Sequence, residues 1–189
     1  MTGTLFIVAT PIGNLDDITF RAFEVLKNVD FVLAEDTRHS KKLLSHLDIS
    51  KPIRAFHEHN EREKTKAIIS EIYSGKSIAL ISDAGTPLIS DPGYFLVAQA
   101  KKEGLKVVPI PGPTALITAL SASGLASDSF TFLGFLPSKQ TARVKLLIGL
   151  VGRTETIIFY ESPKRILATL TDMQTIFGDS LEVCLAKEL

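Results

Sequence analysis

The stretch Leu80–Gly93 carries the densest set of residues that could bind a small polar ligand. It contains two glycines, two prolines, two aspartates, two serines and a threonine. Its glycines permit backbone conformations that other residues disfavour, and its prolines fix the local path of the chain. A rigid loop of this kind would present backbone amides and carbonyls around Asp83, which suits a small polar cofactor. An ordinary long surface loop is the alternative interpretation.

Acidic residues follow another predicted strand, where a nucleotide site is a competing interpretation. Glu35 and Asp36 come directly after an apolar run, and the loop after the first apolar run contains Gly13. In a dinucleotide-binding fold, an acid at the end of the second strand holds a ribose hydroxyl. However, Gly13 stands alone where the fingerprint of that fold needs three glycines, and the chain has no Walker phosphate loop. A nucleotide site at Gly13 and Asp36 therefore remains a less supported alternative.

The histidines do not form a metal-binding pattern. His57 and His59 flank Glu58, and alternate residues of a strand point to opposite faces, so we expect them not to converge on one ion. His39 and His46 lie seven residues apart on a predicted helix and could share a face, but no cysteine or carboxylate cluster joins them. We therefore predict no bound metal.

Basic residues are unevenly distributed and allow two interpretations. One is a solvated helix face, and the other is a wall of cations that contacts phosphates, because binding a nucleic-acid backbone needs Lys and Arg gathered on one side. From residue 136 to residue 165 the only acids are Glu155 and Glu161. The basic residues concerned are Arg38, Lys41 and Lys42 after the second predicted strand, and Lys139, Arg143, Lys145, Arg153, Lys164 and Arg165 in the second half.

Length and composition limit the fold and the compartment. The chain has 189 residues, enough for one large domain or two small ones, and 21 basic side chains balance 21 acidic ones. The single cysteine, Cys184, excludes a disulfide framework and lies in a predicted strand, where free cysteine behaves as a small hydrophobe. No signal-peptide pattern or membrane-spanning apolar run is present. We expect a soluble cytoplasmic protein.

Strands and helices must position these residues, and they alternate five times along the first half of the chain. This alternation predicts an α/β domain at residues 1–123 with a mostly parallel five-stranded sheet. The stretch Leu80–Gly93 would then lie at the carboxyl end of the fourth strand, where open parallel sheets bind their ligands. The predicted strands are Thr4–Ala9, Phe31–Ala34, Ile53–Phe56, Ser77–Ile81 and Leu105–Ile110.

A small, polar segment at residues 124–129 predicts a linker to a second α/β domain at residues 124–189. In this domain a helix is expected to begin at Ser162 and Pro163, a favoured cap and first helical position. The chain stops soon after the last predicted strand, so we expect the second domain to be incomplete and the chain to be a fragment. The predicted strands are Phe130–Phe135, Thr156–Tyr160 and Leu181–Ala186.

Five ordered motifs give the chain a family resemblance. It resembles the ribosomal RNA small-subunit methyltransferase I family, within the tetrapyrrole-methylase superfamily. The resemblance implies S-adenosylmethionine as cofactor, bound in a cleft between two α/β domains, and 2′-O-methylation of a cytidine ribose in 16S rRNA near the decoding region. It also implies a homodimer in the bacterial cytoplasm that acts on rRNA or on the small ribosomal subunit. The motifs occupy residues 9–17, 34–38, 82–93, 111–115 and 159–165.

Two departures from the family pattern affect what can be carried over. Members of the family continue past the strand at which this chain ends, so the 189 residues alone need not be active. Lys164 stands where a histidine is expected in the last motif, so no role of an imidazole is carried over to this position.

The proposed reaction and the resemblance together give candidate site residues. Methyl transfer is an in-line displacement that depends on alignment of the ribose oxygen, and a weakly acidic hydroxyl benefits from a general base. Glu35, Asp36 and Glu161 follow predicted strands and are the candidate bases. Phosphates would be held by Arg38, Lys139, Arg143, Lys164 and Arg165. Cofactor contacts are implied at Pro11, Asp83, Gly85, Thr86, Thr114, Ala115, Phe159, Tyr160 and Ala186.

Two other functions stay open at this point. A related enzyme could methylate a tetrapyrrole or another small molecule with the same cofactor loops. Alternatively, the fragment could bind cofactor or RNA without turnover.

Overall fold

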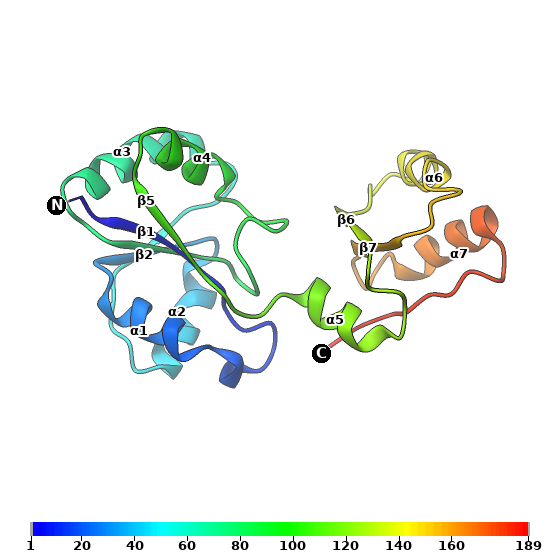
Figure 1. Ribbon diagram of the computed structural model, residues 1–189, viewed down its shortest axis with the longest axis horizontal. Coiled ribbons are helices and arrows are strands. Elements are labelled where there is room, and N and C mark those ends of the chain that lie inside the picture. Colours follow the sequence, from blue (N-terminus) through cyan, green and yellow to red (C-terminus); the bar gives the residue numbers. More distant parts are fainter. Residues whose placement is uncertain (1, 189) are drawn as a thin grey trace. The chain divides into compact units, whose positions relative to one another are not determined.

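The computed structural model describes residues 2–188, and the chain in it forms two compact units (Figure 1). The first unit extends to Ala115 and the second begins at Leu116. The predicted linker at residues 124–129 lies within the second unit, after its first helix. None of the helices formed by residues 2–188 is both long and apolar enough to cross a membrane.

A five-stranded, fully parallel sheet forms the centre of the first unit. Its strand order is β3-β2-β4-β1-β5, so β4 lies between β2 and β1. All residues of β2 and β4 are buried, which explains why both strands consist of continuous apolar runs. The strands are β1 (Thr4–Val8), β2 (Phe31–Ala34), β3 (Ile53–Ala55), β4 (Ile78–Ile81) and β5 (Lys106–Ile110).

Helices cover both faces of this sheet (Figure 1). The helices α1 (Phe20–Asn28) and α2 (Thr37–His46) pack on one face, where Leu26 and Leu44 meet Val8 and Ala79. On the other face, α3 (Glu61–Tyr73) and α4 (Tyr94–Lys102) bury apolar side chains against β1, β2 and β4. Fully burying one such side chain contributes about 1.5–3 kcal/mol, so both faces help to hold the strands in register. The α/β class is confirmed.

The direction of the connections reverses next to β4. The chain leaves β1 and β2 toward helices on one face, whereas it leaves β4 toward α4 on the opposite face. Strand β4 lies between β1 and β2. The loop at its carboxyl end therefore runs to the opposite face of the sheet from the loops that follow its two neighbours. Open α/β sheets bind their ligands at such a switch point.

The second unit contains a small parallel pair of strands and three helices. Strand β6 (Phe130–Phe135) pairs with β7 (Thr156–Tyr160), with an irregularity between Phe132 and Phe135. Helix α5 (Ala115–Ser123) precedes the strands, and α6 (Gln140–Ile148) and α7 (Ile166–Phe177) pack against each other.

Two predictions for the second unit are wrong. The segment Leu181–Ala186 forms no strand in the structure, and Leu181, Val183 and Leu185 are 43–64% exposed. A strand needs a hydrogen-bonding neighbour, which an apolar run cannot guarantee. Cys184 is accordingly exposed rather than held in a buried strand.

The last helix also begins later than predicted. Helix α7 starts at Ile166, and the preceding residues form a turn in which the Ser162 hydroxyl accepts a hydrogen bond from the Lys164 amide. The Ser-Pro pair therefore starts a turn before the helix rather than the helix itself.

Candidate functional site

Three loops meet at the carboxyl edge of the first unit's sheet. Thr10, after β1, and Gly85, after β4, exchange two backbone hydrogen bonds of 2.9 and 3.0 Å. The Thr10 hydroxyl also donates to the Ser82 carbonyl at 3.2 Å, and the Thr86 hydroxyl donates to the Pro113 carbonyl at 3.1 Å. These bonds join the loops after β1, β4 and β5 at the switch point.

The loop after β4 adopts unusual backbone conformations. Its positive φ angles occur at Gly85 (84°), Leu88 (73°), Ser90 (67°) and Gly93 (125°). Non-glycine residues in this region are strained by about 1–3 kcal/mol each, and such strain gathers at functional sites. A Cβ atom on Gly93 would lie 2.6 Å from Leu80 Cδ2, so this position needs glycine for space as well as for conformation. The loop after β4 therefore has a specific backbone conformation that depends on its glycines.

Of the nine predicted cofactor residues, Ala115 begins α5 directly after the joined loops, and five belong to those loops: Pro11, Asp83, Gly85, Thr86 and Thr114. The other three belong to the second unit. Phe159 and Tyr160 are partly buried in β7, and the Tyr160 ring packs edge-on against Phe132 with centroids 4.9 Å apart. Ala186 is exposed in the segment that forms no strand. A role for these three in cofactor binding stays a prediction.

Glu35 and Asp36 are adjacent in the chain but differ in their surroundings. The Asp36 carboxylate accepts hydrogen bonds from the Arg38 amide and guanidinium, both at 2.8 Å, and Arg38 holds its pKa well below the usual range. Asp36 thus caps α2 and stays ionised. Glu35 is exposed and has no such cation. Burial of its carboxyl and then the charge of Asp83 raise the pKa of Glu35, while His57 partly opposes this.

Asp83 links this pair to the loop after β4. Its Oδ1 accepts a hydrogen bond from the Asp36 amide at 3.1 Å. The ribose-binding role considered for Asp36 in a dinucleotide fold fits poorly, because its carboxylate already caps a helix and pairs with Arg38.

Asp91 is a site residue that the sequence interpretation missed. Its pKa is raised to about 6, chiefly by burial and then by the charges of Glu35 and Asp83, while a hydrogen bond from Ser82 partly opposes the shift. Three carboxylates thus interact at one edge without a neutralising arginine for Glu35 or Asp91. The signal available in the sequence was its place in the same Gly/Pro-rich stretch as Asp83.

Glu161, the third candidate base, is held firmly in the second unit. Its side chain is 5% exposed and pairs with Arg165 at 2.6 Å. It also accepts hydrogen bonds from the Thr169 hydroxyl and the Ser162 amide, both at 2.7 Å. Burial alone would raise its pKa, but these hydrogen bonds and the Arg165 charge outweigh burial and lower it. A carboxylate so occupied is poorly placed to accept a proton.

The predicted phosphate contacts also separate into groups. Arg143 is buried and forms an ion pair with Asp172 at 2.7 Å, which argues against a contact with RNA. Arg165 is partly buried by its pairing with Glu161. Lys139, at the start of α6, and Lys164 are exposed, and the Arg38 side chain is 88% exposed.

The histidine pair differs from expectation in its local geometry. Residues 58–60 form a turn, so the rings of His57 and His59 approach edge-to-face with centroids 6.0 Å apart instead of diverging. Between residues 2 and 188, no group of three or more His, Cys, Asp or Glu side chains is arranged to hold a metal ion.

Comparisons with known proteins agree with this architecture. The "Ribosomal RNA small subunit methyltransferase I" of Vibrio cholerae is 58% identical over 98% of this chain and 64% of its own length. The proteins of the same name from Haemophilus influenzae (56% identical, 100% and 67%) and Escherichia coli (52%, 99% and 65%) are similar. The chain thus spans about two thirds of the length of the curated relatives it matches.

Solved structures share the fold at low sequence identity. A uroporphyrin III C-methyltransferase from Thermus thermophilus superposes with a TM-score of 0.63 at 16% identity, covering 94% of this chain and 78% of its own. A diphthine synthase gives 0.66 at 15% identity, covering 91% and 74%. The model of the tetrapyrrole (corrin/porphyrin) methylases matches residues 4–189. With a parallel sheet, a switch point and a match along nearly its whole length, the chain belongs to the tetrapyrrole methylase family.

Proposed function

We propose that this chain carries the cofactor-binding part of an S-adenosylmethionine-dependent methyltransferase that acts on a cytidine ribose 2′-oxygen of 16S rRNA near the decoding region. The supporting observation is the set of three hydrogen-bonded loops at the switch point. It occurs in a chain that is 52–58% identical to proteins named as small-subunit rRNA methyltransferases.

The chemistry of the joined loops suits this cofactor. A Cβ atom on Gly112 would lie 2.8 Å from the Ala9 Cβ, and one on Gly85 would lie 3.3 Å from Ile12 Cγ2, so only glycine fits without a shift. Backbone amides and carbonyls of such loops can hold the amino-acid and ribose groups of the cofactor. The Asp83 carboxylate has a second oxygen beside the one bonded to Asp36, which can accept from a hydroxyl or ammonium group.

The reaction places two demands on the protein's own residues. The cofactor supplies a methyl group on a sulfonium ion, and the protein must hold the ribose oxygen in line with that methyl group. It must also receive the hydroxyl proton, and Glu35 is the base that we propose. Its carboxyl is exposed, free of an arginine partner and shifted to a higher pKa, as suits a general base near neutral pH. Asp36 and Glu161 would act by positioning helices.

Exposed cations supply the proposed contacts with the substrate backbone. Arg38, Lys139 and Lys164 project into solvent and could neutralise phosphates. The proposal includes a homodimer in the cytoplasm that takes rRNA or the small ribosomal subunit as substrate.

A second candidate is methylation of a tetrapyrrole or another small molecule. Its support is the description of the family and the fold shared with a uroporphyrin III C-methyltransferase. The uroporphyrin III C-methyltransferase is only 16% identical to this chain, and a similarity of that size supports a shared fold alone. The relatives named as rRNA methyltransferases are more than 50% identical.

Labelled S-adenosylmethionine separates these candidates. The protein is incubated with the labelled donor and small ribosomal subunits, free 16S rRNA or a porphyrinoid. Label in an alkali-resistant dinucleotide supports ribose 2′-O-methylation. Label in the porphyrinoid, or donor binding without transfer to any acceptor, contradicts the proposal.

Two matched variants test the assigned residues. Glu35→Gln should lower the rate of transfer about 10²–10⁴-fold while leaving donor affinity unchanged, because it removes the base and keeps the shape. Thr86→Val should weaken donor binding by removing the hydrogen bond to Pro113. Ser121→Ala, which removes a hydroxyl bonded within α5, is the control. Full activity of Glu35→Gln would exclude Glu35 as the base.

A further inference from the structure

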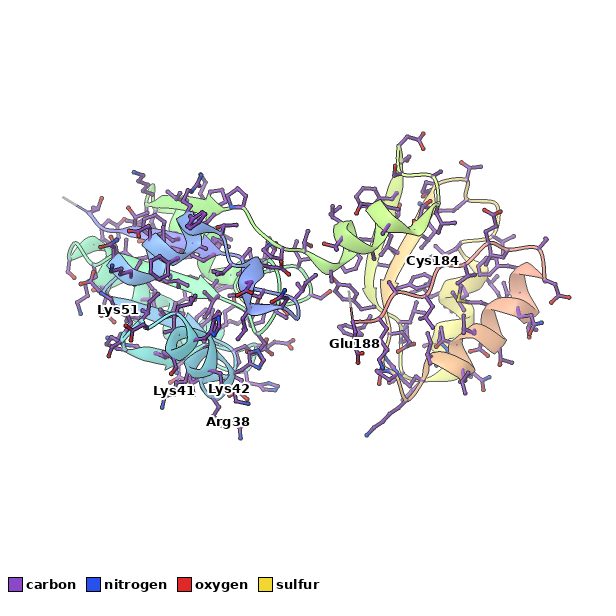
Figure 2. The ribbon with its side chains drawn as sticks, turned by 90° about the horizontal axis from the view of Figure 1, so that it is seen from below. Arg38, Lys41, Lys42, Lys51, Cys184 and Glu188 are labelled. Atoms are coloured by element: carbon purple, nitrogen blue, oxygen red, sulfur yellow. The ribbon has the colours of Figure 1, made fainter. Side chains whose placement is uncertain are left out.

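We propose that the outer face of α2 and the loop that follows it bind the sugar-phosphate backbone of RNA and lead it toward the candidate cofactor site. This surface consists of Arg38, Lys41, Lys42 and Lys51 and is called the α2 basic surface below. The inference rests on the proposed function for the identity of the RNA. Figure 2 shows the four side chains on α2 and on the loop after it.

Helical spacing places three of these cations on one side of α2. Lys41 and Lys42 follow Arg38 by three and four residues, the separations at which helical side chains are neighbours. Leu43 and Leu44 are buried, and Leu44 belongs to the core cluster on the sheet, whereas Arg38, Lys41 and Lys42 are exposed. The apolar side of the helix is thus already used, which excludes insertion into a lipid surface.

The charge of this segment contrasts with the rest of the chain. Residues 37–52 contain four of the 21 basic residues and one of the 21 acidic residues, Asp48. The segment therefore carries a net charge of +3, and the remaining residues carry −3. A neutral protein with a basic segment of this kind can attract a polyanion locally.

The lysines of the surface have no internal partner. In residues 2–188 no ion pair or side-chain hydrogen bond is formed by Lys41, Lys42 or Lys51. Some basic residues elsewhere are paired internally, as Arg54 and Lys76 are with Glu71. Fold stability therefore does not account for the three lysines.

Their placement even opposes helix stability. Cations near the first turn of a helix face the positive end of the helix dipole, and like charges three or four residues apart cost about 0.2–0.5 kcal/mol per pair. Helix α2 has no acidic residue in its first turn, and only the cap Asp36 offsets Arg38. An arrangement that costs stability on an exposed face is expected where a ligand of opposite charge binds.

A hollow lies along this surface. Its volume is about 660 Å³, and residues of α2 and of the following loop line it, including Lys41, Lys51, Ser45, Ser50 and Asp48. Two ammonium groups and two hydroxyls can donate to phosphate or ribose oxygens, while Asp48 can accept from a ribose hydroxyl. This mixture suits a nucleic-acid backbone, in which phosphates and ribose hydroxyls alternate at a regular spacing.

The α2 basic surface starts at the candidate site. Asp36, which caps α2, donates its amide to Asp83 in the loop after β4. Ten helical residues extend about 15 Å from that point. RNA bound along α2 would therefore lead its backbone toward the loops that we propose to hold the methyl donor.

The test compares two triple variants of the protein for binding to 16S rRNA over a range of salt concentrations. Lys41→Gln/Lys42→Gln/Lys51→Gln removes the surface. Lys101→Gln/Lys102→Gln/Lys106→Gln removes three exposed lysines at the end of α4 and the start of β5 and is the matched control. Each lost phosphate contact lowers the salt slope by about 0.7–0.9, so the first variant should lose about 2 from the slope and about 10–100-fold in affinity at low salt.

Other readouts separate this inference from the proposed function. Affinity for S-adenosylmethionine should be unchanged in both variants, which shows that the fold is intact. If the unaltered protein transfers methyl groups to RNA and the first variant binds RNA normally, the inference fails and the function stands. If the unaltered protein binds RNA through these lysines but transfers nothing, the function fails and the inference stands.

Two further outcomes would overturn the inference. One is an equal loss of affinity in both variants, which would show an effect of net charge alone. The other is displacement of the RNA by polyglutamate at the same charge concentration, which would show an unspecific site for polyanions.

Discussion

Two carboxylates of the first unit and two of the second have opposite environments. In the first unit, Glu35 and Asp91 lie at the sheet edge without an arginine, and burial and like charges raise their pKa values. In the second unit, Glu161 and Asp172 each pair with an arginine, and their pKa values are lowered. Charges that are fully paired stabilise a fold, whereas charges left unpaired at a cost indicate a site that meets a ligand.

The largest effect is expected from the buried pair of the second unit. Arg143→Met keeps the length of the side chain but leaves the Asp172 carboxylate buried without its cation, which should cost about 3–5 kcal/mol of unfolding free energy. Urea denaturation measures the loss. Adding Asp172→Leu removes the unpaired charge and should restore most of the stability. A single variant as stable as the parent would contradict the structural role of Arg143.

Glu161→Ala should have the next largest effect. It removes the partner of Arg165 and the acceptor of the Thr169 hydroxyl, so about 2 kcal/mol should be lost at pH 7. Because the pKa of Glu161 is lowered by folding, its contribution is present above its unfolded value of 4.5 and disappears as the pH falls below it. Denaturation at pH 7 and at pH 3 checks the difference. An equal loss at both pH values would mean that packing, not charge, is responsible.

Asp91→Asn should have the opposite sign. The folded protein holds the pKa of Asp91 at about 6, above the unfolded value of 3.8, so its ionised form costs stability above that range. Asparagine removes this cost and should add about 1–2 kcal/mol at pH 8. This gain is smaller than the free energy that corresponds to a shift of two pKa units, because the residue is partly open to water. The gain should vanish near pH 4. Thermal unfolding across this pH range tests the prediction. A loss of stability at pH 8 would contradict the view that the Asp91 carboxylate is unfavourable to the fold.

Glu35→Gln should change stability least. Its carboxyl is exposed and bonded to no other described side chain in the structure, so the expected gain at pH 8 is under about 0.5 kcal/mol. The measurement is the same as for Asp91→Asn, with Glu24→Gln, an exposed residue of α1, as the control. A large loss would show that Glu35 supports the fold, as Glu161 does.

The sequence predicted the centre of the first unit well because its strands β2 and β4 are buried on both faces. Continuous apolar runs such as Phe31–Ala34 and Ile78–Ile81 have few alternatives to a central strand. The loop after β4 was also predictable, since the glycines and prolines that shape it are visible in the sequence.

Pairwise partners could not be predicted from the sequence. Nothing local shows that Arg143 faces Asp172, 29 residues later, instead of solvent. The apolar run Leu181–Ala186 resembles a strand but has no neighbour within the described residues. Asp91 was missed for the same reason, because its raised pKa depends on burial in the folded chain and then on the charge of Glu35, which lies at another strand end.

The bonds between Thr10 and Gly85 and between Thr86 and Pro113 also have a consequence for folding during synthesis. Their partners are separated by 75 and 27 residues, so no shorter piece of the chain can assemble the three loops. A ribosome must therefore release the chain beyond Pro113 before the site that we propose for the methyl donor can form. From that moment the donor would favour closure of the sheet, and its cellular concentration would help to decide how quickly newly made molecules escape proteolysis.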